Sequence, residues 1–274
     1  MRKLLILASS LLLLTTFTFV GCGDDDDDPV GSKQVAMMFG QTALCEGYLY
    51  FYSYIFDIEG LEPDIDSILI EDEKAEIQIG YGEGLMMGQA HYEEDQGSLE
   101  SGDDVTIEIY TSGGKSSCTV SLLDCEDDVP EVIGWASSSP YDTIDAEDPI
   151  EIDWHPVDNA EWYLVDYYYS YDSNGTHDSH DAYYATSDTF FTLAGTETEY
   201  NGYFEFNIVA INGPTPDASS GNITGEYVRG AIISYASDWF DIYVGTGDAW
   251  PSPLKPTDDI EHRDISKRLT EIYK

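Results

Sequence analysis

Apolar and polar residues alternate along most of the chain, and this two-residue period is typical of β-strands. In the run DVTIEIY, Val105, Ile107 and Ile109 alternate with Thr106 and Glu108, which predicts one buried face and one wet face. Similar runs are YLYFYSYIF, SILIED, AEIQIGYG and SCTVSLLD, and Gly, Asp and Pro turns separate them. A helical period is almost absent between residues 34 and 250. The pattern therefore predicts an all-β protein.

The first residues depart from this pattern. Arg2 and Lys3 precede an uncharged apolar run over residues 4–20, as in a secretory signal peptide. A transmembrane helix is the alternative, but the run is shorter than the roughly 20 residues that crossing a bilayer requires. We therefore expect export.

The run ends in FVGC, which resembles the lipobox of bacterial lipoproteins, although Phe19 stands where that family usually has leucine. The resemblance implies that residues 1–21 are removed and that Cys22 is lipidated, which places the protein in the bacterial cell envelope, at the outer membrane or cell surface. Cleavage elsewhere, with Cys22 lost or free, is the alternative. Five consecutive aspartates follow Cys22, and their mutual repulsion would keep residues 22–33 extended as a tether.

Charge excludes one class of partner. The chain has 54 acidic and 11 basic residues and a formal net charge of −43, whereas nucleic-acid binding needs clustered Lys and Arg. Because 42% of the residues are hydrophobic and 13% are aromatic, the chain can still bury substantial cores.

We divide the folded part into two domains. In residues 34–128, the stretch LESGDDVTIEIYTSGG resembles the late strands of bacterial immunoglobulin-like modules. In residues 129–248, IEIDWHPVDNAEWYLVDYYYS resembles the B and C strands of a fibronectin type III domain, and TSDTFFTLAGTETEYNGYFEFNIVAINGP resembles its E and F strands. These resemblances imply two tandem β-sandwiches. The inward residues of the second would be Ile150, Ile152, Trp154, Tyr163, Val165, Tyr167, Phe204, Phe206, Ile208 and Ala210.

Residues 249–274 form a separate C-terminal segment. A Pro-rich linker leads to TDDIEHRDISKRLTEIYK, whose apolar stripe of Ile260, Ile265, Leu269 and Ile272 predicts an amphipathic helix. A helix of this length is marginal in water unless it packs against something, so we expect it to dock on the acidic body or on an acidic partner.

The cysteines beyond Cys22 are Cys45, Cys118 and Cys125. In an oxidising compartment we expect a disulfide. The preferred pair is Cys45 with Cys125, because Cys45 comes just before the strand-like run GYLYFYSYIF and Cys125 just after the strand-like run CTVSLLD, so that a bridge would close those two ends. Cys118 shares its parity with Val120 and Leu122, which points it inward.

One sheet face of the second domain is unexpectedly apolar. The residues opposite in parity to the predicted core should be polar, yet many are not. Two explanations are open: the C-terminal helix or the first domain covers this face, or it binds an external protein or glycan. The binding-face candidates are Trp162, Leu164, Tyr168, Tyr203, Val209 and Ile211.

The junction of the two predicted domains is acidic. It loosely resembles the calcium-binding linkers of cadherin-type repeats, which would make Asp124, Glu126, Asp127 and Asp128 calcium ligands. A solvated linker without metal is the alternative, and no other cofactor is expected.

No catalytic spacing of residues is found among the five histidines and their neighbours. We therefore expect a non-catalytic binding or structural module, such as an adhesin or scaffold, attached to the membrane through its lipid and contacting an unknown protein or glycan. The alternative is a carbohydrate-binding accessory or glycan-active surface protein, since the 21 tyrosines and 5 tryptophans could stack on sugar rings.

Overall fold

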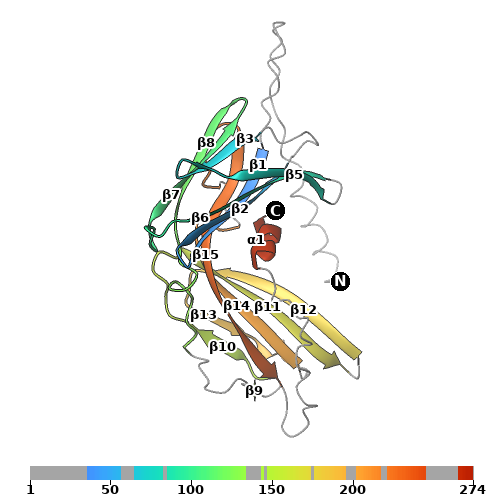
Figure 1. The fold of residues 1–274 in the computed structure, drawn as a ribbon. Helices are drawn as coiled ribbons and strands as arrows, with labels where there is room; N and C mark the ends of the chain where they lie inside the picture. The colour runs from blue at the N-terminus through green and yellow to red at the C-terminus, as the bar shows by residue number, and fades with distance from the viewer. Residues whose placement is uncertain are drawn as a thin grey trace, which may run out of the picture. The chain divides into compact units, whose positions relative to one another are not determined.

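The computed structural model describes residues 36–56, 65–82, 85–133, 143–144, 147–173, 176–195, 202–216, 221–244 and 265–273. Within these ranges it contains fifteen strands and one helix, α1 (Ile265–Tyr273), which confirms the all-β prediction (Figure 1). The predicted signal peptide, Cys22 and the tether lie outside the described residues, as does most of the predicted linker.

A nine-stranded sheet runs through the described chain. Its main path is β12 (Thr176–Thr186), β11 (Trp162–Ser173), β14 (Gly202–Asn212), β15 (Val228–Val244), β1 (Ala36–Cys45), β2 (Tyr48–Phe56), β6 (Leu85–Asp95) and β5 (Glu76–Gly82), and the short β9 (Thr143–Ile144) also pairs with β15.

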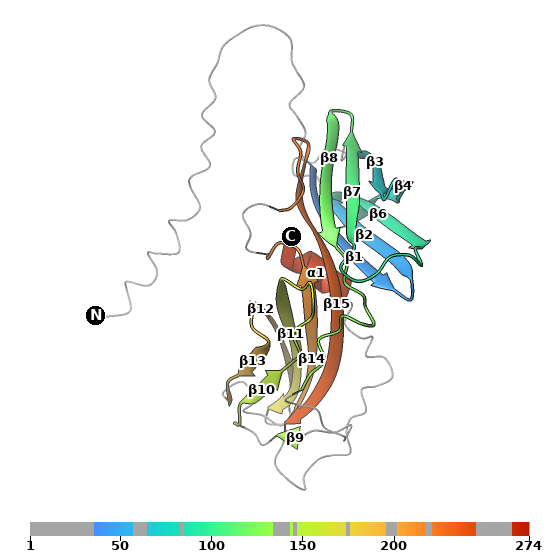
Figure 2. The same cartoon turned by 90° about the vertical axis from the view of Figure 1, so that its left-hand side faces the viewer.

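β15 joins the two halves of this sheet. Its first part pairs in parallel with β1, from Ala36 opposite Val228 onward. Its second part pairs in antiparallel fashion with β14, ending with Gly202 opposite Val244. Figure 2 shows β15 passing from one group of strands into the other. A strand that belongs by sequence to the second predicted domain therefore also completes the first.

A glycine permits the close approach of β15 to β1. Gly230 has a φ of 136°, a conformation that side-chain-bearing residues rarely adopt. A Cβ atom at this position would overlap the carbonyl oxygen of Met38 on β1. The parallel pairing is thus compatible with glycine and not with a larger residue.

Two smaller sheets form the second layers. One contains β4 (Glu73–Lys74), β3 (Ile65–Ile70), β7 (Asp104–Thr111) and β8 (Gly114–Ser121); the other pairs β10 (Ile150–Asp153) with β13 (Phe190–Leu193). Each encloses a separate core with one half of the large sheet. The first core includes Leu49, Phe51, Ile107, Cys118 and Ile232, and the second contains Ile150, Ile152, Trp154, Tyr163, Val165, Tyr167, Phe204, Phe206, Ile208 and Ala210.

This second cluster contains every residue that the sequence placed in that core, and Cys118 lies in the first core as expected. The sandwich prediction is therefore confirmed. The domain boundaries, residues 34–128 and 129–248, stay a prediction. Residues 34–274 form one compact unit, in keeping with the shared β15.

Residue parity along β15 defines two faces of the large sheet. Val228 and Ile232 point into the first core, and Ile242 and Val244 point into the second, so both cores lie on the same side. Residues of opposite parity, such as Ile233, belong to a third cluster on the other side. We call that other side the outward face. It runs without interruption across both halves.

Candidate functional site

α1 covers the outward face where the two halves meet (Figure 1). Leu269 of α1 is fully buried in the third cluster. Tyr273 stacks on Phe39 of β1 with ring centroids 4.4 Å apart, and it also lies 6.4 Å from the ring of Trp162. The apolar stripe predicted from the sequence therefore lies against the sheet at Leu269.

Polar contacts fix the position of α1. Arg268 donates to Asp166 over 2.9 Å and pairs with Asp181 over 3.0 Å. Its guanidinium also lies 5.0 Å from the centre of the Tyr183 ring. In addition, the side-chain amide of Gln41 donates to the Thr270 hydroxyl over 3.1 Å. These contacts connect α1 to β11, β12 and β1.

The predicted binding-face residues share the outward face, but α1 changes their exposure. Trp162, Leu164, Val209 and Ile211 are buried in the cluster that contains Leu269. The indole of Trp162 donates to the carbonyl oxygen of Gly213. Of the two explanations that the sequence left open, the described structure shows the first, cover by the C-terminal helix, at these four side chains, and binding of an external partner to them stays a prediction. The physical reason for their burial is that α1 fills the apolar surface itself.

The other two candidates, Tyr168 and Tyr203, remain half-buried. The Tyr203 hydroxyl donates to Asp241 over 2.8 Å. Burial, followed by this hydrogen bond, raises the pKa of Tyr203, so the phenol stays protonated and remains a donor. Binding of an external ligand to this part of the face stays a prediction.

A row of aromatic rings lies on the outward face of β2, beyond α1. Alternate residues of β2 point outward, and these are Tyr48, Tyr50, Tyr52, Tyr54 and Phe56; we call them the β2 ladder. Ring centroids are 6.3 Å apart for Tyr48 and Tyr50 and 5.2 Å apart for Tyr52 and Tyr54. Tyr48 and Tyr50 are 39% and 36% exposed. Large aromatic side chains in a row with this exposure are unusual on a sheet surface and mark a candidate contact site.

The pattern of YLYFYSYIF predicts a strand, and the row of tyrosines on its outward face was not recognised from the sequence. The ladder could have been found there, because the inward parity of Leu49, Phe51 and Ile55 sends every tyrosine of that run outward.

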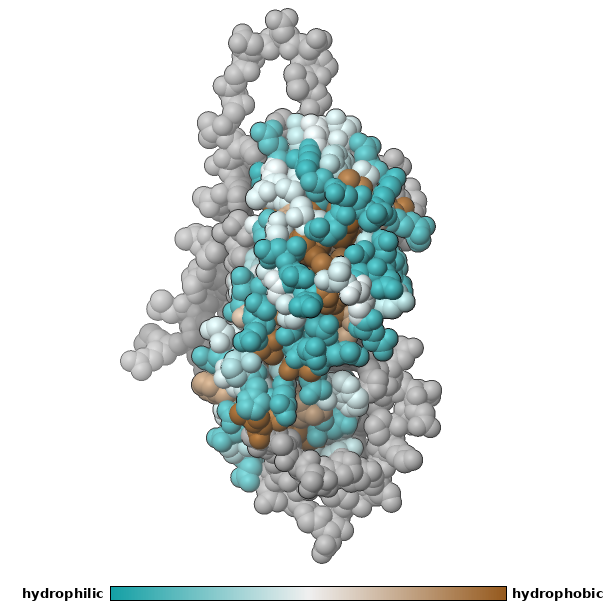
Figure 3. Space-filling model, turned by 60° about the vertical axis from the view of Figure 1, so that its left-hand side comes forward, coloured by the Kyte–Doolittle hydropathy of each residue, from teal (hydrophilic) through white to brown (hydrophobic). Residues whose placement is uncertain are grey.

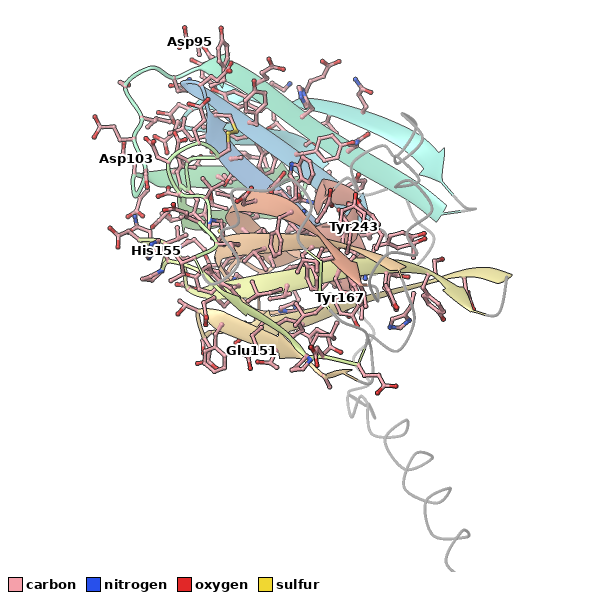
Figure 4. The ribbon with its side chains drawn as sticks, turned by 90° about the horizontal axis from the view of Figure 1, so that it is seen from below. Asp95, Asp103, Glu151, His155, Tyr167 and Tyr243 are labelled. Carbon is pink, nitrogen blue, oxygen red and sulfur yellow. A yellow bond between two sulfur atoms is a disulfide. The ribbon has the colours of Figure 1, made fainter. Side chains whose placement is uncertain are left out.

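Carboxylates flank the exposed end of the ladder. In the pairing of β2 with β6, Tyr50 lies opposite Glu93, Tyr48 opposite Asp95 and Tyr52 opposite His91. Asp95 lies at the end of β6 (Figure 4). Desolvation, with further contributions from Glu93, Glu46 and Tyr48, raises the pKa of the Tyr50 phenol. This end of the ladder therefore combines aromatic rings with negative charge.

Two of the predicted calcium ligands, Asp124 and Asp128, accept hydrogen bonds from nearby backbone amides. Asp124 accepts from the backbone amides of Glu126 and Asp127 at 2.8 and 3.2 Å. Asp128 accepts from the amide of Asp124 at 2.7 Å. Among the described residues, no group of three or more His, Cys, Asp or Glu side chains is placed to hold a metal ion. The calcium hypothesis stays a prediction, with a structural role for two of its carboxylates now visible.

The cysteines follow the sequence interpretation. Cys45 and Cys125 form a disulfide, drawn in yellow in Figure 4. Cys118 is a buried free thiol, and burial raises its pKa to about 12. Cys22 lies outside the described residues, so its lipidation remains a prediction. Within the described part of the chain, no helix is long and apolar enough to span a membrane.

The surface agrees with the acidic composition. On the side drawn in Figure 3, hydrophilic residues predominate and smaller hydrophobic areas lie between them. Among the larger exposed apolar side chains are Phe190 on β13 and Trp239 on β15.

No family model matches the chain, and no curated protein matches it either. Among solved structures, it is similar to the FN1–FN3 domains of chicken CNTN1, with 13% identity, a TM-score of 0.27 and coverage of 79% of this chain and 69% of the other. The mouse nectin-like molecule 4 ectodomain (Ig1–Ig3) gives 10% identity and a TM-score of 0.22, covering 80% and 66%. Domains from titin give 9% and 0.17, covering 72% and 59%. All three TM-scores are low, and the fold assignment rests on the strand pairing and the buried clusters.

Proposed function

We propose that this protein is a non-catalytic binding module of the bacterial cell envelope, held to the membrane by a lipid on Cys22, with the β2 ladder as its ligand-contacting surface. The observation that carries the proposal is the row of rings from Tyr48 to Tyr52, in which Tyr48 and Tyr50 are exposed and Tyr52 is half-buried. Aromatic side chains supply large contact areas at a small entropic cost, and they are enriched among the residues that dominate binding energy.

The position of the ladder supports this role. Its inward neighbours Leu49, Phe51 and Ile55 are fully buried, so the rings stand on a rigid strand. α1 occupies the adjacent apolar part of the outward face, and in the described part of the chain the ring contacts of Tyr48, Tyr50 and Tyr52 are with residues of β2 and β6. An extended tether of the kind predicted for residues 22–33 would hold such a surface away from the lipid.

A carbohydrate-binding role is the second candidate, and the ladder also supports it. Rings in a row can stack on successive sugar units, as the apolar faces of sugars pack on aromatic side chains. The ladder therefore suits two classes of ligand, a protein and a glycan, which digestion of a crosslinked adduct separates.

Photo-crosslinking in the native host would test the proposal. Tyr50 is replaced by benzoylphenylalanine in the full chain, and Phe190, which is 56% exposed on another sheet, receives the same replacement as a control. We expect a discrete adduct from position 50 and none of that size from position 190. Protease or glycosidase digestion then classifies the adduct. Equal labelling from both positions, or from neither, would refute the ladder as the binding surface.

A further inference from the structure

We infer that the exposed end of the β2 ladder binds a cationic, extended peptide segment with Lys or Arg at alternate positions. This inference rests on the proposed function and names the ligand class of the same surface. The site, which we call the tyrosine–acid strip, comprises Tyr48, Tyr50 and Tyr52 on β2 and His91, Glu93 and Asp95 on β6.

Charge is the first argument. Cross-strand partners lie within direct reach of each other, so the pairing of Tyr50 with Glu93 and of Tyr48 with Asp95 places a carboxylate beside each exposed ring. Within the described residues, neither Glu93 nor Asp95 forms a salt bridge. The strip therefore presents ring faces and negative charge, both of which attract a cation.

The protein itself shows twice how this combination binds a cation. Arg268 lies over the Tyr183 ring and pairs with Asp181, which precedes Tyr183 by two residues on β12. On β7 and β8, Lys115 lies 5.7 Å from the centre of the Tyr110 ring and pairs with Glu108. In both cases one cation contacts a tyrosine and a carboxylate on the same sheet face. The strip repeats the tyrosine and the carboxylate, with the two on neighbouring strands.

Spacing is the second argument. The Tyr48 and Tyr50 centroids lie 6.3 Å apart along β2. An extended peptide rises about 3.3 Å per residue, so its alternate side chains lie about 6.6 Å apart on one side. Cations at every second position would therefore meet successive rings in register. A neutral glycan could also stack on the rings, but it would cover Glu93 and Asp95 without compensating their charge.

The test uses the full chain and a seven-residue peptide in which Lys alternates with Ser. Binding of this peptide is measured by calorimetry at several salt concentrations. Two comparison ligands are measured in the same way: an isomeric peptide whose four Lys are adjacent, and a neutral xylo-oligosaccharide. Because the whole protein carries a net charge of −43, non-specific attraction of polycations must be separated from the strip.

Matched variants make that separation. Glu93→Gln with Asp95→Asn removes two charges from the strip, whereas Asp72→Asn with Glu73→Gln removes two exposed charges at the β3–β4 turn. We expect the strip variant to weaken binding of the alternating peptide about tenfold and to flatten its salt dependence, and the control to change it less than twofold. Tyr50→Ala should weaken binding about threefold to fivefold, while Tyr50→Phe, which keeps the ring, should retain it. Unfolding midpoints of all variants verify that each is folded.

Three results would overturn the inference. The first is an equal loss of peptide affinity in the strip and control charge variants, and the second is equal affinity for the two isomeric peptides. The third is that Tyr50→Ala weakens binding of the oligosaccharide but not of the peptide. The last would leave the proposed binding function intact, with a glycan as the ligand. Failure of photo-crosslinking at position 50 would instead remove the proposed function, so the two failures are distinguishable.

Discussion

Arg268 of α1 donates from its Nε to Oδ1 of Asp166 over 2.9 Å, and the Asp166 side chain is only 2% exposed. A carboxylate so deeply buried is costly unless a cation compensates it. This ion pair connects α1 to β11 and therefore ties the burial of the Asp166 carboxylate to the position of α1.

Removing the cation should release the helix. In Arg268→Ala, Asp166 remains buried without this partner, and we expect the free energy of unfolding to fall by about 3 kcal/mol. A neutral apolar dye should also bind more strongly as Trp162 and Leu164 become accessible. Urea unfolding and dye fluorescence measure both effects. The double variant with Asp166→Asn should recover part of the loss, and an unchanged midpoint in the single variant would show that the pair contributes nothing.

The shared strand should make the two halves unfold together. Ile232 and Ile242 lie on β15 in the first and second cores, respectively, and both are fully buried. We expect Ile232→Ala and Ile242→Ala each to lower the stability of one common transition by about 3 kcal/mol. Hydrogen exchange should show β7 and β14 losing protection at the same urea concentration. Two separate transitions, with only the mutated half shifted, would contradict this coupling.

The disulfide closes a long loop. Cys45 and Cys125 are separated by 80 residues in sequence. On chain-entropy grounds a loop of this length gives a stabilisation of about 4 kcal/mol, which reduction should remove. Unfolding in the presence and absence of a reductant measures the difference, and a Cys45→Ser, Cys125→Ser variant should match the reduced protein. A peptide map that contains only free thiols from the oxidised protein would rule the bridge out.

Cys118 should be inert in the folded state. Burial raises its pKa from 9.0 to about 12, so the thiol is neutral at pH 8 and is also shielded from reagents. We expect alkylation at pH 8 to be slow in buffer and fast in urea. Because the raised pKa favours the neutral form, the associated stability is complete below about pH 9 and is lost as the pH rises towards 12. Rapid labelling of the native protein would contradict this burial.

The membrane anchor depends on one residue. Changing Cys22 to Ala should abolish detergent-phase partitioning, because the resemblance to the lipobox makes its sulfur the lipid attachment point. Mass spectrometry of the mature N-terminus is the matching measurement for the unmodified chain. Partitioning of the variant equal to that of the original protein would exclude this anchor.

The sequence by itself determined which residues point inward along individual strands. The alternation around Ile150, Tyr163 and Phe206 placed these side chains in the second core, and the structure confirms it. The alternation of YLYFYSYIF contained the β2 ladder in the same way, although we read it only as a strand. The direction in which a strand residue points can be predicted from the sequence because the two-residue period is a local property of the backbone.

Only the tertiary structure decided what those faces meet. No local pattern indicates that β15 pairs in parallel with β1, since parity specifies the face of a strand and not its neighbour. The sequence likewise offered two explanations for the apolar face around Trp162, and the contact with Leu269 of α1 depends on where a distant helix packs. Strand partners and helix docking are determined by long-range burial and charge compensation, as in the pair of Arg268 with Asp166, and such terms exist only once the chain is folded.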